Sequence, residues 1–238
     1  MPEFIHKGDD KKKFVQKMFD DISLQYDFLN HILSLGTDIY WRKKFIKQLP
    51  LKRGVCLLDV ACGTGDVGFE ILTKVPVKLI CLDYSFNMIK LARNKAKAKQ
   101  FDNILFLQGD GEKLPLKSES VDILTISYGF RNLGHYENAL KEFYRVLRPG
   151  GTLGILEFSE SKSKILGTLF QFYFNHVLPR IGAFFSKSDA YRYLPESVAH
   201  FPPREEICRK IIYSGFKRST YKDLTFGITT IFSGTKGE

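Results

Sequence analysis

Short apolar runs alternate with helical stretches through the middle of this sequence. Each apolar run has the length of a strand and is bounded by polar or turn residues. The runs occupy residues 55–58, 77–82, 104–107, 121–127 and 152–158. The stretches between them with helical spacing are residues 66–72, 86–99 and 136–147. Because strands and helices that alternate at this interval are typical of βαβ units, we expect an α/β fold with a doubly wound, mostly parallel sheet.

The C-terminal end of the chain breaks this alternation. A helical stretch at residues 204–213 is followed by two strands, 216–224 and 227–235, with a very short turn between them. Strands joined so closely pair as an antiparallel hairpin. Added to the five strands before it, the hairpin gives an expected sheet of seven strands.

Helical segments precede the predicted sheet. Residues 1–10 show no pattern and are expected to form a mobile tail, and apolar residues then recur at helical spacing over residues 14–33. Thr37 is suited to cap a second helix, which ends before Pro50. These helices either pack on the sheet or cover a ligand. We therefore divide the chain into N-terminal helices, residues 1–50, and a main domain, residues 51–238.

A second feature without a place in the alternation is residues 165–179, which contain no Asp, Glu, Lys or Arg. The stretch is too short and too polar to span a bilayer. It suits a helical cover over an apolar pocket, a surface that dips into lipid, or a helix buried in the core. Residues 188–203 have the composition of a polar and aromatic loop. We interpret residues 162–203 together as a cover inserted into the main domain.

Composition indicates a folded domain, and the net charge leaves more than one class of partner open. Hydrophobic residues at 44% and charged residues at 26% of 238 positions are typical of a folded domain. The net charge of +10 suits an RNA or an anionic membrane surface. The basic residues, however, gather locally in the N-terminal arm and on two helix faces, a pattern that solvated helices also show.

The cysteine pattern and the N-terminal residues indicate the cellular compartment in which the protein acts. The four cysteines form no CxxC pair and no metal-ligand spacing, so they are interpreted as reduced thiols and no metal site is expected. Acidic and lysine residues precede any apolar run, which is unlike a signal peptide. We therefore expect a cytoplasmic protein.

The run VCLLDVACGTGD, residues 55–66, carries the first chemical signal. An apolar strand ends at Asp59 and leads into a small-residue turn with Gly63 and Gly65, after which a helix begins. Glycines allow the backbone to approach a ligand, and the amides of a helix N-terminus lie close to it. An adenosine-type cofactor is expected. Residues 63–68 also satisfy GxGxxG, so the glycines alone leave a nicotinamide dinucleotide open.

Polar residues end four of the predicted strands, at the edge of the sheet where ligands of such folds bind. They are Asp59, Asp83, Asp110 and Ser127. Asp83 lies twenty residues after Gly63, where its carboxylate could accept hydrogen bonds from both ribose hydroxyls of either cofactor. Asp110 and Gly111 suit adenine recognition. Together with the turn Pro-Gly-Gly at residues 149–151 and the C-terminal hairpin, this pair resembles class I methyltransferases that use S-adenosyl-L-methionine (SAM). Asp59 agrees, because a carboxylate there favours the amino group of a methionine moiety and repels a pyrophosphate.

Longer runs carry a closer resemblance. They lie at residues 18–20, 26–27, 57–66, 126–132, 144–151, 156–159, 176–182 and 191–197. Together they resemble the ubiquinone/menaquinone biosynthesis C-methyltransferase family from about Phe14 to the C-terminus. The cofactor runs are shared with many methyltransferases, whereas SYGFRN at residues 127–132 and YRYLPES at 191–197 are more specific to this family.

The resemblance implies roles for individual residues. Thr64, Asp83, Asp110 with Gly111, and Ser127 would bind SAM, although many relatives have Asn-Ala at the positions of Asp110 and Gly111. The implied reaction is methyl transfer to a ring carbon of a polyprenylated quinol. Residues expected to orient the ring and stabilise its phenolate are Arg131 and Asn132, with Tyr191 as a further catalytic candidate. Secondary candidates for base or substrate contacts are His176, Asp189, Arg192 and Tyr193.

The expected partners follow from this substrate. We expect peripheral contact with the inner face of a membrane, no nucleic acid and a chain able to form a homo-oligomer. Two other functions stay open: a methyltransferase acting on RNA, suggested by the net charge of +10, and a non-catalytic module of the same fold. The choice between a naphthoquinol and a benzoquinol ring, and the length of the prenyl tail, also stay open.

Overall fold

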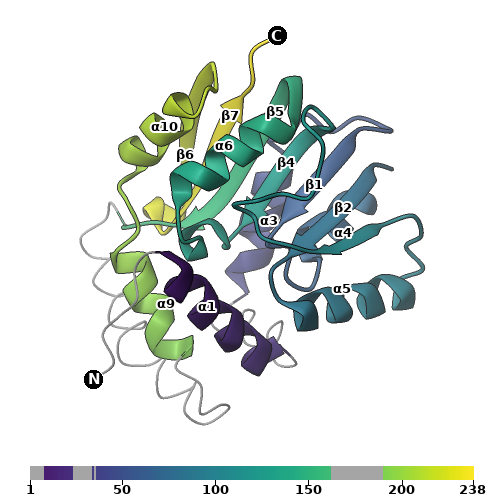
Figure 1. Ribbon diagram of the computed structural model, residues 1–238, viewed down its shortest axis with the longest axis horizontal. Coiled ribbons are helices and arrows are strands. Elements are labelled where there is room, and N and C mark those ends of the chain that lie inside the picture. Colours follow the sequence, from purple (N-terminus) through teal and green to yellow (C-terminus); the bar gives the residue numbers. More distant parts are fainter. Residues whose placement is uncertain (1–7, 24–33, 35, 162–189) are drawn as a thin grey trace.

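The computed structural model describes residues 8–23, 34, 36–161 and 190–238 (Figure 1). Its seven strands form one sheet in the order β3-β2-β1-β4-β5-β7-β6. The strands are β1 Cys56–Val60, β2 Lys78–Asp83, β3 Leu105–Gln108, β4 Val121–Ser127, β5 Leu147–Phe158, β6 Arg218–Leu224 and β7 Thr229–Thr235. The α-helices are α1 Gly8–Ile22, α3 Thr37–Ile46, α4 Asp66–Leu72, α5 Phe86–Ala98, α6 Tyr136–Val146, α9 Ala190–Ala199 and α10 Arg204–Tyr213. Two 3₁₀ turns are η2 Phe130–Asn132 and η4 Thr225–Gly227.

The sheet confirms the doubly wound prediction. The pairs β1·β2, β2·β3, β1·β4 and β4·β5 are parallel. The expected C-terminal hairpin is present as β6 and β7, and β7 pairs antiparallel with β5. The chain winds outward from β1 to β3, then crosses to the other side of β1 to form β4. A crevice therefore opens at the carboxyl ends of β1 and β4, where ligands of such sheets bind.

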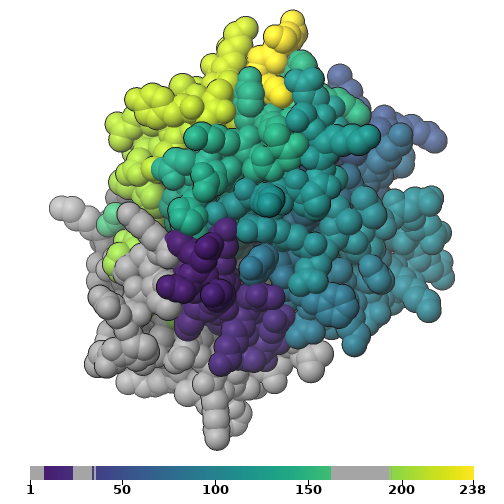
Figure 2. Space-filling view, in the orientation of Figure 1, coloured from purple at the N-terminus to yellow at the C-terminus, as the bar shows by residue number. Residues whose placement is uncertain are grey.

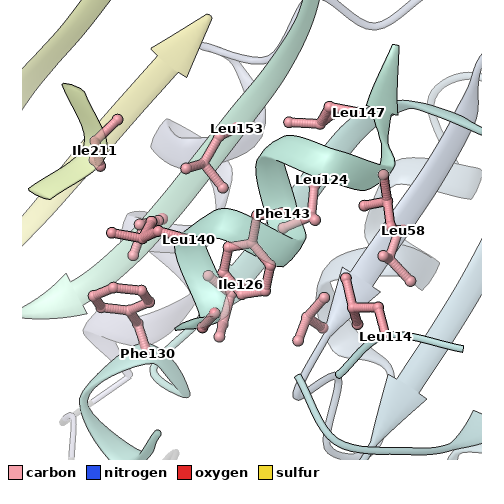
Figure 3. Packing of buried hydrophobic residues seen from close by; sticks show 14 of the residues in the cluster. Leu58, Leu114, Leu124, Ile126, Phe130, Leu140, Phe143, Leu147, Leu153 and Ile211 are labelled. Carbon is pink, nitrogen blue, oxygen red and sulfur yellow. The ribbon is translucent and has the colours of Figure 1, made fainter. Parts of the chain in front are cut away.

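Helices cover both faces of this sheet. On one face α6 and α10 pack against β4, β5 and β7, with Leu140 and Phe143 of α6 fully buried over Leu124 (Figure 3). On the other face α3, α4 and α5 form the second half of the core, which includes Trp41 and Phe45. Because a parallel strand is buried on both faces, its side chains are apolar in both directions. This explains why the strands read as continuous apolar runs in the sequence.

Helices α1 and α9 form a third, smaller layer. Val15, Met18 and Ile22 of α1 pack with Tyr193 of α9 in a separate apolar cluster. In the space-filling view the N-terminal helix, in purple, lies against the teal middle of the chain (Figure 2). Helix α1 belongs to the N-terminal segment that the sequence predicted to cover the site, and it contacts η2 and α5.

Several predicted boundaries were wrong. The expected mobile tail, residues 1–10, already enters α1 at Gly8. Thr37 is not the cap of α3, because Gly36 takes that position with a φ of 74°, and the Thr37 hydroxyl donates to the carbonyl of Ser34 instead. Strand β1 does not stop at Asp59, whose backbone continues the ladder opposite Cys81 and Thr125.

Two further segments differ from the sequence prediction. Strand β5 includes the turn expected at residues 149–151, because Val121 pairs with Leu147 and Ile123 with Thr152, and the residues between bulge out of the ladder. The loop expected at residues 188–203 contains helix α9, despite Pro195 inside it. Tyr193 and Ser197 lie one helical turn apart and are both buried, so packing outweighs the cost of the proline. Residues 165–179 lie outside the described residues.

Candidate active site

A cavity of about 740 Å³, part of which is open to solvent, lies beyond the carboxyl ends of β1, β2 and β4 and under α1. Six of the predicted site residues line it: Gly63, Asp83, Asp110, Gly111, Ser127 and Asn132. Its other walls include Lys12, Val15, Gln16 and Phe19 of α1. The fold thus brings most of the predicted cofactor positions together, at the topological switch point of the sheet.

The turn between β1 and α4 is built from residues in unusual conformations. Gly63 and Gly65 have φ values of 55° and 88°. A β-carbon on Gly65 would lie 2.5 Å from the ring of Phe69, so glycine is required there both by conformation and by space. Ala61 and Tyr128, which also line the cavity, have φ values of 50° and 55° without being glycine. Such strained residues are common at binding sites, where surrounding structure holds them.

Asp83 is fixed at the end of β2 by the turns on either side of the cavity. Its Oδ2 accepts a hydrogen bond from the Gly63 amide at 2.8 Å, and its Oδ1 accepts one from the Ser85 amide at 2.9 Å. Burial raises the pKa of Asp83 to about 6, and the amides of Ser85 and Gly63 oppose that rise. The carboxylate is therefore oriented before any ligand arrives, with acceptor capacity left for hydroxyl groups.

Asp110 interacts with a residue that the sequence analysis missed. Its Oδ1 accepts from the Glu112 amide at 2.8 Å, and its Oδ2 accepts from Lys12 Nζ at 2.9 Å. Lys12 also pairs with the carboxylate of Glu112 at 2.8 Å. A β-carbon on Gly111 would lie 3.0 Å from Val60 Cγ1, so the wall beside Asp110 is kept flat. Lys12 was grouped with the solvated basic residues, because a sequence gives no sign that α1 folds onto this wall.

Asp59 and Thr64 lie behind the cavity wall and do not line it. Asp59 is only 1% exposed, and burial raises its pKa to about 7. Thr125 donates to Asp59 Oδ1 at 2.7 Å, whereas Oδ2 has no hydrogen-bond partner among the described residues. Thr64 is buried, and Lys95 Nζ lies 3.3 Å from its hydroxyl. An unpartnered buried carboxylate oxygen next to a glycine turn is suited to a cationic group.

Arg131, in the η2 turn, is held by three parts of the chain. Its Nη1 donates to Glu157 Oε1 at 2.6 Å and to the Tyr128 carbonyl at 2.7 Å. Its Nε donates to the hydroxyl of Ser197 in α9 at 3.2 Å. Glu157, fully buried on β5, also accepts from the Arg131 backbone amide at 3.0 Å. The guanidinium therefore lies in a buried network beside the cavity, and its predicted contact with substrate stays a prediction.

Asn132 follows Arg131 and does line the cavity. Its amide lies between the Tyr128 carbonyl and the hydroxyl of Tyr193. Tyr191 belongs to α9, but its side chain and that of Arg192 are outside the described residues, as are His176 and Asp189. Of the aromatic residues in the YRYLPES run, Tyr193 is the one that the structure connects to the site.

Glu112, Glu157 and Ser197 are further residues of the site that the sequence analysis did not assign. Glu112 accepts from the backbone amides of Gly134 at 2.6 Å and His135 at 3.0 Å. A buried carboxylate that binds two amides fixes the loop after η2. Glu157 and Ser197 occur in the runs that carried the family resemblance, and this was the available signal for them.

Two negative findings concern the described part of the chain. Within residues 8–23, 34, 36–161 and 190–238, no His, Cys, Asp and Glu side chains gather in a group of three or more that could hold a metal ion. In the same part of the molecule, the helices are too short or too polar to cross a bilayer.

Comparison with known proteins adds to this geometry. A sequence profile of the ubiE/COQ5 methyltransferase family matches residues 6–236. The ubiquinone/menaquinone biosynthesis C-methyltransferase UbiE of Geotalea daltonii is 41% identical over 235 residues, or 98% of this chain and 100% of the relative. The demethylmenaquinone methyltransferase of Deinococcus radiodurans is 44% identical over 229 residues, or 95% of this chain and 94% of the relative.

Solved structures share the fold at much lower identity. A SAM-dependent methyltransferase from Thermotoga maritima has a TM-score of 0.69 at 20% identity and covers 93% of this chain and 99% of its own. Phosphoethanolamine N-methyltransferase 2 of Haemonchus contortus, solved with S-adenosylhomocysteine, has a TM-score of 0.64 at 13% identity, over 83% of this chain and 52% of its own. These likenesses show the fold alone. The family profile and the two relatives span almost the whole chain, and they show that it belongs to the ubiE/COQ5 methyltransferase family.

Proposed function

We propose that the protein transfers a methyl group from SAM to a ring carbon of a polyprenylated quinol, converting a demethylmenaquinol to a menaquinol. The observation that carries the proposal is the convergence of Asp83, Asp110, Ser127 and Asn132 on one cavity in a member of this family. The relatives are named for menaquinone and ubiquinone biosynthesis, so a benzoquinol is the second ring to test. Because a prenyl tail lies in lipid, we expect the protein to act from the cytoplasm at the inner face of the membrane.

The residues of the cavity fit SAM. Asp83 has an oriented carboxylate for the ribose hydroxyls, and the flat wall at Gly111 beside Asp110 suits an adenine ring. Asp59 lies behind the wall of the cavity, and its buried Oδ2 favours positive charge near the glycine turn, where the amino group of the methionine moiety would lie. The bound cofactor supplies an electrophilic methyl group on its sulfonium.

The protein's own contribution is to position the ring and favour its ionised form. Orientation can contribute about 7 to 11 kcal/mol, whereas a general base contributes roughly 10²- to 10⁴-fold in rate. Helix α1 closes one side of the cavity with Val15 and Phe19 and so limits water. Asn132 lies where it could donate to a ring oxyanion, and Arg131, paired with Glu157, holds the Tyr128 carbonyl that binds the Asn132 amide. A loss of pocket shape should therefore cost more activity than the loss of a base.

The test is transfer of labelled methyl from SAM to a reduced demethylmenaquinone, with a demethylated benzoquinol and RNA in parallel assays. We expect labelled menaquinol. Label in RNA, with binding that weakens steeply as salt rises, would favour the alternative suggested by the net charge of +10. Label in no acceptor, despite SAM binding, would contradict the proposal.

Replacement of Asp83 tests the cofactor site. Asp83→Ala should weaken SAM binding by about 1.5 to 3 kcal/mol, the range for hydrogen bonds to a charged group. The measurement is titration calorimetry on the folded variant. Ser118→Ala, on a loop away from the cavity, is the control and should bind SAM as the wild type does. Unchanged affinity in Asp83→Ala would remove Asp83 from the cofactor site.

The raised pKa of Asp83 predicts a pH dependence of SAM binding. The ionised carboxylate accepts hydroxyl hydrogen bonds, and the protonated form does so poorly. Since the pKa of Asp83 is raised to about 6, affinity should fall as the pH is lowered through that value. Asp59, with a pKa of about 7, should contribute an earlier fall in affinity as the pH is lowered through that value. In Asp83→Asn the lower step should disappear, and the upper one should move to lower pH because the Asp83 charge helps to raise the pKa of Asp59; an unaltered profile would contradict the assignment.

A further inference from the structure

The amide of Asn132 has one orientation that its neighbours allow. The Tyr128 carbonyl oxygen can only accept, so the atom of Asn132 that faces it at 3.3 Å must be the amide nitrogen, Nδ2. The amide oxygen, Oδ1, then faces the hydroxyl of Tyr193 at 3.0 Å. An amide oxygen cannot donate, so the tyrosine must be the donor.

Tyr193 is well placed to hold this orientation. Its side chain is 3% exposed and packs against Phe14 of α1 with 5.5 Å between ring centroids. Burial raises its pKa well above the usual range, and Arg131 and Glu157 are charged groups of the described residues that face it. The hydroxyl therefore keeps its proton at neutral pH, where it can donate to Asn132.

The consequence concerns what Asn132 presents to the cavity. An amide nitrogen carries two hydrogens, and the Tyr128 carbonyl takes one of them. Because Asn132 lines the cavity, the second hydrogen can be given to a ligand there. If the amide were reversed, the cavity would receive an acceptor, which would repel an oxyanion. The Tyr128 carbonyl selects the orientation of the amide, and the Tyr193 hydroxyl, bound to Oδ1, keeps the amide from turning away. The two contacts together therefore decide whether Asn132 presents an N–H to an ionised ring.

We propose that Tyr193 is a positioning residue for methyl transfer, which holds Asn132 so that its amide N–H is directed to the ring oxyanion of the acceptor. The inference rests on the proposed function. The quinol's hydroxyl proton passes to solvent at the open side of the cavity, and the ring oxygen becomes an acceptor with negative charge. The ring carbon takes the methyl group, S-adenosylhomocysteine leaves with the electron pair of the broken carbon–sulfur bond, and the hydrogen on that ring carbon is lost to solvent as a proton. Tyr193 exchanges no proton in this step, and it acts only through Asn132.

The experiment compares Tyr193→Phe with a matched control, Tyr136→Phe. Tyr136 is a partly buried tyrosine close to η2, whose hydroxyl donates to the backbone carbonyl of Arg131 at 3.2 Å and makes no contact with the Asn132 amide. We expect Tyr193→Phe to lower kcat by about 10- to 100-fold, somewhat less than loss of an oxyanion donor itself. SAM affinity should stay within about twofold, because Tyr193 does not line the cavity. Tyr136→Phe should keep kcat near that of the wild type, although both variants lose one buried hydroxyl.

A double-mutant cycle separates positioning from a structural role. If Tyr193 acts through Asn132, then Tyr193→Phe should cost little when added to Asn132→Ala. Fully additive losses would overturn the proposal. So would a Tyr193→Phe variant that melts at a lower temperature but keeps the kcat of the wild type.

A binding measurement gives a second readout that needs no turnover. 4-Nitrophenol changes its absorbance on ionisation, so its pKa can be measured when bound to the protein with S-adenosylhomocysteine. We expect the bound phenol to ionise at lower pH in the wild type and Tyr136→Phe than in Tyr193→Phe, by about one pH unit. Equal values in all three proteins would overturn the proposal. A retained shift in a wild type that methylates no quinol would instead reject the proposed substrate.

Discussion

Methyl transfer is expected with the reduced ring alone, and an oxidised quinone should give no detectable product. Transfer from a sulfonium requires the acceptor carbon to donate an electron pair. The two carbonyls of a quinone withdraw density from the ring, whereas loss of a hydroxyl proton from a quinol places charge on the adjacent carbon. The rate should therefore also rise with pH as the bound quinol ionises, until the ionised form predominates.

The chain's cysteines offer no internal route to the reduced ring. All four, Cys56, Cys62, Cys81 and Cys208, are free thiols and none forms a CxxC pair. Burial raises the pKa of Cys56 and Cys208, which makes the reactive thiolate scarce. We infer that the quinol must be supplied already reduced.

An anaerobic assay measures this dependence directly. One sample holds the substrate fully reduced with dithionite, and a second holds it fully oxidised with the reductant omitted. SAM binding by calorimetry in both samples controls for damage to the protein. Comparable methylation rates in the two samples would contradict the requirement for a reduced ring.

The second large effect is expected at Glu157. Glu157→Ala should lower the free energy of unfolding by about 3 to 5 kcal/mol, the cost of removing one partner of a buried ion pair. The Arg131 guanidinium lies 2.6 Å from Glu157 Oε1, with 7% of its own side chain exposed and none of the Glu157 side chain, so the variant would leave a buried cation without its partner. The Arg131 and Phe158 amides would lose their acceptor as well.

Chemical denaturation of paired variants measures the loss. Glu137→Ala is the control, because Glu137 pairs with Lys210 at the surface with 55% of its side chain exposed. Exposed pairs contribute about 0 to 1 kcal/mol, so the control should unfold nearly as the wild type does. Similar decreases in the free energy of unfolding of the two variants would show that the buried Arg131–Glu157 pair stabilises the fold no more than an exposed pair does.

Arg131→Lys addresses function at the same place. Lysine keeps the positive charge but cannot reach the Tyr128 carbonyl, Ser197 and Glu157 together, because it lacks the fork of donors. We expect lower turnover with nearly unchanged SAM affinity. Equal turnover in the two proteins would count against any role of the guanidinium in the reaction.

The cofactor side of the site could be predicted because it is local in sequence. Asp83 and Ser127 end strands that are themselves recognisable as apolar runs, and parallel strands end at one edge. The glycine turn is likewise formed by consecutive residues, so the sequence is enough to predict it. Asp59 shows the limit of this reasoning, since its carboxyl group lies buried inside a strand and is stabilised there by Thr125, on a different strand, and by the Gly68 amide.

The layer above the cavity could not be predicted in the same way. Lys12 is one of three consecutive lysines, and nothing in its neighbours separates a solvated cation from one bound to Asp110 and Glu112. The residues of α9 favour a loop when only the sequence is considered, because they include Pro195 and several polar side chains. Both features depend on packing between segments that lie far apart in the chain.

The sequence by itself determined the succession of strands with the helices between them, the edge of the sheet at which the cavity lies, and the family. These follow from periodicity and from short runs whose chemistry is carried by neighbouring residues. Only the tertiary structure decided that Arg131 is held by Glu157 and Ser197, while Asn132 lines the cavity with its amide held by Tyr193. The physical reason is that a polar side chain has no preferred partner until folding removes it from water, and partners 26 to 66 residues away are then brought within hydrogen-bond distance.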